Sequence, residues 1–326
     1  MAINLLDIQP NKVSRDLGGY ITYIYGPAGA GKTTFGSKMP KPLLLAAEPG
    51  YRAIPGIRAI DITSWGELKQ VLRELKKPEV KDAYSSIICD TVDIMADLCQ
   101  KYICNQLGIE NIGDGGWTTN GWSKYKKEFE ETFRTLAQQG YAIVFLGHAK
   151  EKTIKPQFGD EYQQICPALQ SSAATIVENM CDIIGYAHTY LKEGNSYRVL
   201  TLRSADDSVL CKSRFKNIKH EIDFSYDSLA EALHDAIDSE ADEHNGQFVT
   251  DDKMKAVEAA TYDYEALMAE FQDMVGKIMA SNSNNAPRIS QIVEKYLGRG
   301  KKVSDTTANQ AELVSLIVGE IKDELM

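Results

Sequence analysis

Short apolar segments recur along the first 150 residues, and segments with the 3.6-residue period of amphipathic helices separate them. This alternation predicts an α/β fold in which parallel strands are linked by crossover helices on both faces of a sheet. The predicted strands are 20–25, 43–47, 85–90 and 141–147. The predicted helices between them are 64–75, which opens on the capping box Ser64-Trp65-Gly66-Glu67, then 92–107 and 122–139.

The pattern changes after residue 180, where shorter apolar segments alternate with turn-forming sequences. It predicts an antiparallel extension of the sheet and a closing helix. These strands are 183–190, 197–203 and 208–211, and the helix is 226–238. An acidic stretch poor in large apolar residues then predicts a linker, and helical periodicity returns in the tail. The predicted domains are a core, 1–238, a linker, 239–255, and a helical C-terminal module, 256–326, with helices at 261–280, 286–297 and 308–325.

The composition is that of a globular protein, with 43% hydrophobic and 25% charged residues among 326. No leader-like N-terminus and no apolar run of membrane length is visible, so we expect a cytoplasmic protein without a membrane partner. Six cysteines without metal-ligand spacing predict reduced thiols and no zinc site. They are Cys89, Cys99, Cys104, Cys166, Cys181 and Cys211.

The net charge of -10 is unevenly distributed along the chain. Residues 240–326 carry 9 Lys and Arg against 16 Asp and Glu, so −7 of the total lies there. The rest of the chain is nearly neutral and can carry a local basic face for nucleic acid despite the acidic total.

A loop of small residues follows the first predicted strand and fits the pattern G-x-x-x-x-G-K-[ST] at every fixed position. Between a strand and a helix, such a loop turns backbone N–H groups inward, where they cradle the oxygens of a nucleoside triphosphate. Lys32 adds a charge for the β- and γ-phosphates, and Thr33 is placed to hold Mg²⁺. A chance glycine-rich turn is the alternative. The predicted nucleotide-binding residues are Gly26, Pro27, Ala28, Gly29, Ala30, Gly31, Lys32, Thr33 and Thr34.

Two carboxylates follow other predicted strands of the same sheet. Asp90 ends the strand 85–90 and can orient Mg²⁺ directly or through its water shell. Many ring ATPases place a Glu directly after this Asp, but Thr91 stands there. Glu48, directly after the strand 43–47, can instead accept a proton from the water that attacks the γ-phosphate. A solvated Glu that opens a Glu-Pro-Gly turn is the alternative.

This arrangement resembles the RecA-type ATPase core, in which the catalytic Glu follows the strand after the phosphate-loop helix. The resemblance implies a γ-phosphate sensor at His148, where related proteins usually place Gln. It also implies that Lys212 and Arg214 enter the nucleotide site of the neighbouring subunit. Positions i and i+2 of a strand point to the same side, so both cations can reach one phosphate. A structural histidine and a solvated basic strand edge are the alternatives.

The order of motifs is similar to that of a narrower family, the phage-encoded RecA-core nucleotide-binding proteins. It runs from Tyr-Gly-Pro-x-Gly-x-Gly-Lys-Thr-Thr through Leu-Leu-x-x-Glu-x-Gly, Ile-x-Asp-Thr and Gly-His-x-Lys-Glu to Lys-Ser-Arg, over about residues 15–235. Members act as single-strand annealing recombinases. The resemblance implies an ATPase that uses ATP and Mg²⁺, assembles with itself on single-stranded DNA and promotes homologous recombination in the host cytoplasm.

RecA-type cores direct the loops after the third and fourth strands towards DNA, and here these are residues 108–121 and 149–167. Aromatic rings give bases a stacking surface, and lysines neutralise phosphates. The candidate DNA contacts are Trp117, Trp122, Lys124, Lys150, Lys152 and Lys155. Tryptophans that pack a helix and a solvated lysine face are the alternative.

A basic group lies within the acidic tail and comprises Arg299, Lys301 and Lys302. It suggests contact with a protein, such as a single-strand binding or replication protein, rather than with DNA. Two other functions remain open for the whole chain. One is a P-loop phosphotransferase, although no Arg-rich lid follows the fourth strand. The other is a nucleotide-dependent switch or adaptor that does not act on DNA.

Overall fold

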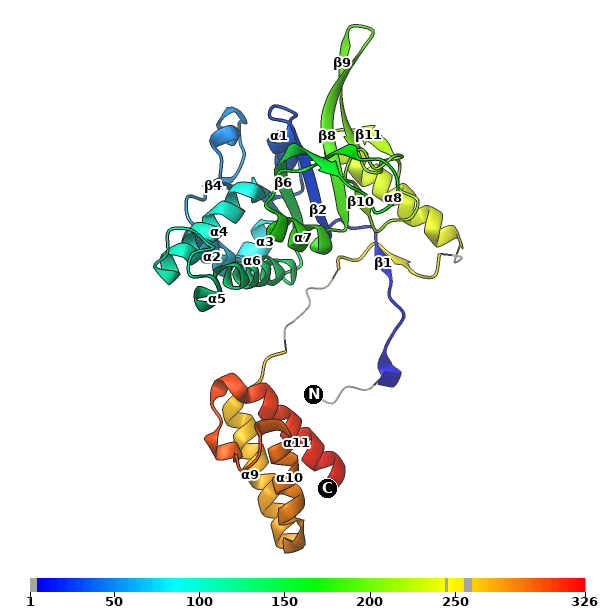
Figure 1. Ribbon diagram of the computed structural model, residues 1–326. Coiled ribbons are helices and arrows are strands. Elements are labelled where there is room, and N and C mark those ends of the chain that lie inside the picture. Colours follow the sequence, from blue (N-terminus) through cyan, green and yellow to red (C-terminus); the bar gives the residue numbers. More distant parts are fainter. Residues whose placement is uncertain (1–4, 244–245, 255–259, 326) are drawn as a thin grey trace. The chain divides into compact units, whose positions relative to one another are not determined.

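The computed structural model describes residues 5–243, 246–254 and 260–325 (Figure 1). The chain divides into two compact units, Met1–Glu258 and Ala259–Met326. The first unit carries the predicted sheet, and the second is built from helices.

The main sheet contains ten strands within the described residues of the first unit, and its centre is parallel. In spatial order the parallel strands are β8 (Ile183–Lys192), β2 (Ile21–Gly26), β6 (Ala142–Ile154), β5 (Ser86–Asp90), β3 (Pro42–Ala46) and β4 (Ala59–Asp61). The antiparallel strands are β9 (Asn195–Thr201), β11 (Glu221–Asp223), β10 (Lys212–Ser213), which pairs with β8, and β7 (Tyr162–Pro167), which pairs with β6. β6 therefore lies between β2, which leads into the phosphate loop, and β5, which ends at Asp90.

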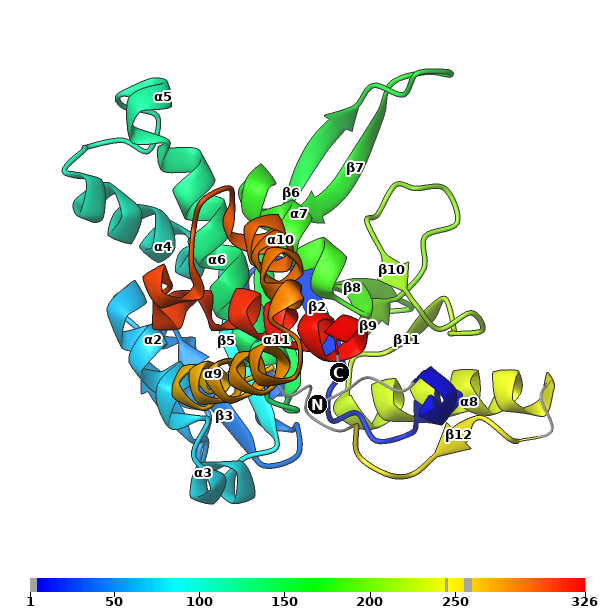
Figure 2. The ribbon, with the colours of Figure 1, turned by 90° about the horizontal axis from the view of Figure 1, so that it is seen from below.

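Helices cover both faces of the sheet (Figure 1, Figure 2). One face packs against α2 (Trp65–Glu74), α4 (Val92–Leu107), α6 (Gly121–Ala137) and α7 (Ser171–Met180), and the other packs against α1 (Lys32–Ser37) and α8 (Tyr226–Glu243). The connections contain α3 (Pro78–Ala83), α5 (Gly116–Thr119) and the 3₁₀ segments Leu5–Asp7 and Pro49–Ala53. A separate parallel pair joins β1 (Val13–Ser14) to β12 (Val249–Thr250).

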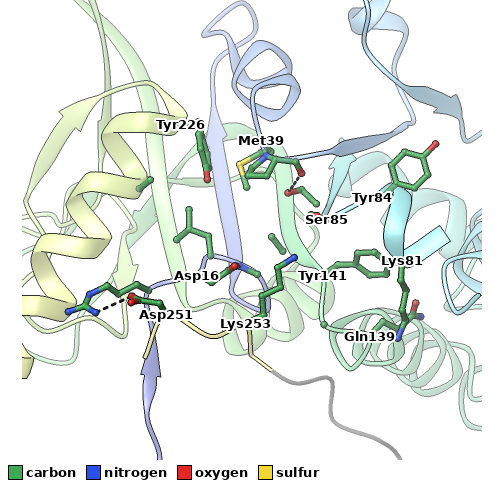
Figure 3. Close-up of a pocket in the computed structure, with 18 of the residues that line it drawn as sticks. Asp16, Met39, Lys81, Tyr84, Ser85, Gln139, Tyr141, Tyr226, Asp251 and Lys253 are labelled. Carbon is green, nitrogen blue, oxygen red and sulfur yellow. Dashed lines mark hydrogen bonds and ion pairs between the residues drawn. The ribbon is translucent and has the colours of Figure 1, made fainter. Parts of the chain in front are cut away.

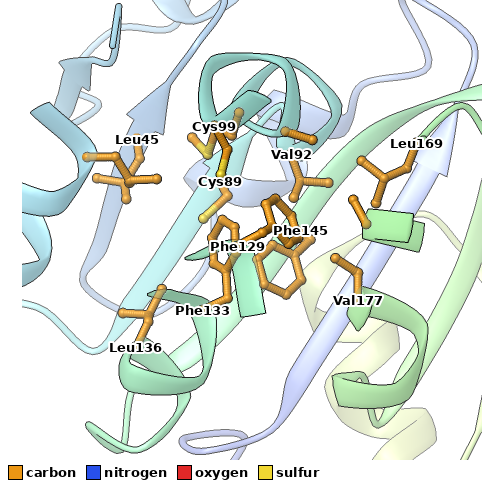
Figure 4. Packing of buried hydrophobic residues seen from close by; sticks show 14 of the residues in the cluster. Leu45, Cys89, Val92, Cys99, Phe129, Phe133, Leu136, Phe145, Leu169 and Val177 are labelled. Atoms are coloured by element: carbon orange, nitrogen blue, oxygen red, sulfur yellow. The ribbon is translucent and has the colours of Figure 1, made fainter. Parts of the chain in front are cut away.

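Strand side chains alternate between two apolar clusters, one on each face of the sheet. Phe145 belongs to the cluster under α4 and α6, whereas Leu146 belongs to the cluster under α1 and α8. In the first cluster the Phe133 ring centroid lies 4.9 Å from that of Phe129 and 5.1 Å from that of Phe145 (Figure 4). Truncating a buried Phe to Ala typically costs about 3–5 kcal/mol, so these rings hold α6 firmly on β6.

The second unit packs three helices around its own apolar core. They are α9 (Tyr264–Ser281), α10 (Ala286–Leu297) and α11 (Ala311–Leu325), joined through the 3₁₀ segments Ser283–Asn285, Val303–Asp305 and Ala308–Gln310. Ile278, Ile289 and Ile317, one from each helix, are buried in this core. The helical periodicity of the tail thus comes from three faces that bury one another.

The predicted fold class is confirmed. The first unit is an α/β core with a mostly parallel sheet, helices on both faces and an antiparallel extension, and the second is a small helical module. The capping box also forms: the Glu67 N–H donates to Ser64 Oγ at 3.2 Å, and the Ser64 N–H donates to Glu67 Oε2 at 3.1 Å. The sequence pattern missed β4 and α3, which are too short to show a clear period, and it also missed α7.

The acidic stretch 239–255 is not a linker throughout. Helix α8 continues to Glu243, and β12 pairs with β1 at the N-terminal end of the chain. The Val13 N–H donates to the carbonyl oxygen of Phe248 at 2.8 Å. Acidic composition concealed these elements because they bury little apolar surface of their own.

Two predicted strand boundaries were wrong. The segment 149–167 is a β-hairpin rather than a loop, because β6 continues to Ile154 and pairs with β7. The segment 208–211 is not a strand; Val209 makes a single bridge to Ile165, and β10 follows at Lys212–Ser213. No helix in the described part of the chain is long and apolar enough to span a membrane.

Candidate nucleotide site

The phosphate loop joins β2 to α1 at the carboxyl edge of the parallel strands. All six residues of β2 are buried, and α1 begins at Lys32 directly after Gly31. Gly31 has a φ of 98°, a left-handed conformation that favours glycine. A Cβ on Gly26 would lie 2.2 Å from the carbonyl oxygen of Ala187, so the strand β8 beside it also requires glycine. The glycines of the motif therefore serve backbone conformation and close packing.

The Lys32 side chain lies inside this loop. Its Nζ donates hydrogen bonds of 2.9 Å to the carbonyl oxygens of Gly26 and Pro27. Burial lowers the pKa of Lys32, and three nearby carboxylates partly oppose this shift. The loop carbonyls therefore hold the ammonium group where a phosphate can exchange with them.

Thr33 and Asp90 form the metal side of the site. Thr33 Oγ1 donates to Asp90 Oδ2 at 2.7 Å, and the Asp90 residue is only 3% exposed. Burial raises the pKa of Asp90, and the bond from Thr33 opposes that shift. Mg²⁺ prefers oxygen ligands and commonly binds one or two protein groups together with phosphates. A hydroxyl beside a carboxylate fits this preference, so Thr33 and Asp90 would hold Mg²⁺.

Glu48 lies beside Asp90, because the parallel strands β3 and β5 are neighbours and their carboxyl ends lie at the same edge of the sheet. Strand β3 ends at Ala46, two residues earlier, and Glu48 precedes the 3₁₀ segment Pro49–Ala53. The backbone N–H groups of Ala47 and Glu48 both donate to the carbonyl oxygen of Asp90, at 2.6 and 3.3 Å. The Glu48 side chain is 35% exposed. A carboxylate on a fixed backbone that still reaches solvent suits a base that takes a proton from water.

His148 lies on the strand between the phosphate loop and Asp90. Its register partner on β2 is Gly26, and from Ala149 onward β6 leaves the parallel sheet and pairs with β7. His148 thus stands at the edge of the sheet, although the strand does not end at 147 as predicted. His148 Nε2 lies 3.7 Å from Glu48 Oε1. The structure therefore brings together Glu48 and His148, which the sequence predicted separately.

Two residues near this site were missed by the sequence prediction. Asp93, in the first turn of α4, has Oδ2 2.7 Å from His148 Nδ1. Arg198 of β9 has Nη1 3.3 Å from the position that a Cβ of Gly31 would occupy, so its guanidinium lies against the phosphate loop. An acidic residue in the first turn of a helix is ordinarily explained by its favourable interaction with the helix dipole, so Asp93 did not stand out as a site residue. No local pattern marks Arg198, because its contact depends on the order of strands.

Lys212 and Arg214 lie at the opposite end of the sheet. Lys212 pairs with Ile184 near the start of β8, and its Nζ donates to the carbonyl oxygen of Glu178. Arg214 pairs with Asp182 at 3.0 Å and donates to the carbonyl oxygen of Asn179 at 3.1 Å. Both side chains thus point to the end of α7. Lys212 is level with Tyr23 in the middle of β2, and Arg214 lies at the amino end of that strand, so both side chains point away from the phosphate loop of their own chain.

The segment 108–121 does not follow a strand, which corrects the expectation from the RecA-type core. It follows α4, because β5 leads directly into that helix, and it contains α5. Trp117 on α5 is 97% exposed. Trp122 is partly packed, with its ring edge-on to Tyr125 at 6.1 Å between centroids. Lys124 is exposed on α6, the helix that also carries Trp122.

The hairpin β6–β7 carries the other DNA candidates. Lys150 Nζ donates to the carbonyl oxygen of Leu169 at 3.1 Å. Lys155, just beyond β6, pairs with Glu161 at 2.7 Å across the hairpin. Lys150 and Lys152 share one face of β6 because they are two positions apart. In Figure 2 this hairpin and α5 project on the same side of the sheet from separate points.

The cavity shown in Figure 3 lies at the amino edge of the sheet, away from the phosphate loop. Its volume is about 640 Å³, and its lining includes the first residues of β5 and β6, Ser86 and Ala142. Arg15, which lines it, pairs with Asp251 at 3.1 Å. None of the described residues that line the cavity belongs to the phosphate loop, so the cavity is separate from the nucleotide site.

A phosphate loop, a buried Thr33–Asp90 pair and an accessible Glu48 at one edge of a mostly parallel sheet define a P-loop ATPase. The comparison with protein families agrees with this class. A family model described as "AAA domain" matches residues 19–215. The chain belongs to this AAA-domain family.

The chain is similar over its full length to the SPbeta prophage-derived uncharacterized protein YorG of Bacillus subtilis (strain 168). The two are 28% identical over 331 residues, which cover 100% of this chain and 99% of YorG. Among solved structures it is similar to a KaiC-like protein of Pyrococcus horikoshii OT3, at 14% identity and a TM-score of 0.34 over 58% of this chain and 81% of that one. It is also similar to the flagellar accessory protein FlaH of Methanocaldococcus jannaschii, at 10% identity and a TM-score of 0.34 over 59% and 82%.

Proposed function

We propose that the protein hydrolyses ATP, assembles on single-stranded DNA and promotes annealing or homologous recombination in phage DNA metabolism. The observation that carries the proposal is the meeting of Lys32, the Thr33–Asp90 pair and Glu48 at one edge of the sheet. This is the set of groups that phosphoryl transfer to water needs. The similarity to a prophage-derived protein supports a role in phage biology.

In this mechanism the loop N–H groups and Lys32 bind the β- and γ-phosphates. Thr33 and Asp90 would hold Mg²⁺, which would neutralise part of the phosphate charge. Glu48 orients the attacking water and accepts its proton. His148, 3.7 Å from Glu48, faces the same region and responds to the γ-phosphate.

The position of Lys212 and Arg214 supports the proposal of self-assembly. Because they lie at the end of β8 that is remote from their own phosphate loop, they act on the nucleotide of a neighbouring subunit. The Arg214 side chain is 56% exposed despite its ion pair with Asp182, which leaves it accessible to a second copy of the chain. Each nucleotide site is then completed by the next subunit.

The hairpin β6–β7 is the proposed DNA contact. Trp117 on α5 and Trp122 at the start of α6 belong to the same proposed contact. Lys150 and Lys152 on β6 supply charge, and Phe158 in the turn of the hairpin is 84% exposed. Exposed rings among lysines suit single strands, since each base offers a face to stack on. Arg299, Lys301 and Lys302 are exposed in the second unit, where we propose a contact with a single-strand binding or replication protein.

ATP turnover measured with and without a single-stranded oligonucleotide tests this function. The decisive variant changes Lys150, Lys152 and Lys155 together to Ala, and a matched control removes the exposed Lys38, Lys76 and Lys101. We expect only the first variant to lose DNA-stimulated turnover and to reduce the salt dependence of DNA binding. Equal behaviour of the two variants would refute the hairpin as a DNA contact. Turnover indifferent to DNA in the wild type would favour a switch or adaptor.

A further inference from the structure

Asp93 makes the shortest contact of His148. Its Oδ2 lies 2.7 Å from His148 Nδ1, and its side chain is only 17% exposed. The second oxygen, Oδ1, is buried and has no hydrogen-bond partner among the described residues. Leaving a carboxylate oxygen unsatisfied is costly, about 1–3 kcal/mol or more. A residue kept at that cost beside a nucleotide site invites a functional explanation.

The bond to Asp93 decides which nitrogen of His148 carries the proton. A carboxylate can only accept, so His148 Nδ1 must be the donor. In the neutral ring Nε2 then has no hydrogen and presents a lone pair. That lone pair faces Glu48, whose Oε1 is 3.7 Å away.

Two acceptors at this separation do not bond to each other. A water molecule between them can donate one hydrogen to Glu48 and the other to His148, which orients its oxygen lone pairs away from both. That is the orientation required of a water that attacks phosphorus. The opposite tautomer, with a hydrogen on Nε2, would instead donate to Glu48 and occupy the base.

We propose that Asp93 is a positioning residue, which fixes the tautomer of His148 so that His148 and Glu48 together hold the attacking water. The inference rests on the proposed ATP hydrolysis and adds a function for Asp93 and a second one for His148. In this account the neutral His148 is an acceptor for water. In the neutral ring with Nδ1 bonded to Asp93, Nε2 has no hydrogen to donate to the γ-phosphate, so the response of His148 to this phosphate runs through the water that it shares with Glu48.

The direct test is the nitrogen-15 spectrum of the imidazole rings at about pH 8.5, where an ordinary histidine is neutral. The full chain labelled at its five histidines is compared with His148→Ala, which identifies the His148 signals. We expect a protonated Nδ1 and a bare Nε2 in the wild type, and a shift towards the Nε2–H form in Asp93→Asn. Asp97→Asn, one helical turn further along α4 and exposed, is the matched control and leaves the spectrum of His148 unchanged.

Turnover of ATP supplies the second readout. Asp93→Asn keeps the size of the side chain, and we expect kcat to fall at least about 10-fold with KM for ATP little changed, because Asp93 does not touch the nucleotide. Asp97→Asn keeps both constants. A wild-type His148 protonated on Nε2, or an Asp93→Asn variant with normal kcat, overturns the inference. A chain with the expected tautomer that does not hydrolyse ATP overturns the proposed function instead.

Discussion

Replacing Lys32 by Ala tests the phosphate loop at its most specific side chain. A unit charge at about 4 Å from another contributes about 4 kcal/mol at the effective dielectric constant near a protein surface. Against this, binding of phosphate exchanges the two hydrogen bonds from Lys32 to Gly26 and Pro27, each with a net value of about 1 kcal/mol. The remaining contribution of about 2 kcal/mol predicts that Lys32→Ala weakens ATP binding roughly 30-fold.

The assay is calorimetric titration of ATP with Mg²⁺ into each variant, with thermal unfolding measured on the same samples. Lys38→Ala is the control, because Lys38 directly follows the last residue of the same helix and its side chain is exposed. We expect the control to bind as the wild type does. Since burial already disfavours the charged form of Lys32, its removal should not lower the unfolding temperature. An affinity within threefold of wild type in a folded Lys32→Ala protein would refute the assignment of the loop.

Three further variants test other parts of the site. Burial raises the pKa of Asp90, so its contribution to stability falls as the pH rises from the ordinary value of 3.8 through the raised one. Asp90→Asn should therefore raise the unfolding temperature at neutral pH but not below pH 3.8, and it should abolish Mg²⁺-dependent hydrolysis. A calorimetric unfolding temperature that does not rise at neutral pH would contradict the burial of a charged Asp90. Lys32→Ala and Arg214→Ala should each be inactive, yet a mixture should regain about a quarter of wild-type turnover, because one interface in four pairs an intact loop with an intact Arg. A silent mixture of folded variants would exclude the shared site. Arg198→Ala should weaken ATP binding about 10-fold, whereas Lys192→Ala on the same hairpin should not; equal affinities would remove Arg198 from the site.

Much of the fold could be predicted because it depends on regular burial. The central strands β2, β3 and β5 and helix α4 lie within a residue or two of the prediction, and β6 begins where predicted but continues to Ile154. The hairpin β6–β7 could not be predicted in this way, since residues 150–153 of β6 are exposed without alternation and β7 is mostly half-buried. The pair β1–β12 joins residues more than 230 positions apart, and no local pattern encodes such a contact.

The site residues likewise divide into those that the sequence could predict and those that it could not. Lys32 and Thr33 follow from a motif whose spacing is fixed by a single strand, loop and helix, and Asp90 follows from its position at the end of another strand. Glu48 follows from its position beyond the next strand. Asp93 and Arg198 could not be predicted, because the first depends on the rotation of α4 above β6 and the second on β9 lying one strand away from the phosphate loop.

We expect ATP and single-stranded DNA together to build an assembly of this chain. Electron microscopy of the protein with ATP, Mg²⁺ and a single-stranded oligonucleotide tests it most directly. We expect regular assemblies that need both ATP and DNA, and that need roughly 30-fold more ATP with Lys32→Ala. Particles that remain single subunits under these conditions, or that assemble equally well without DNA, would contradict it.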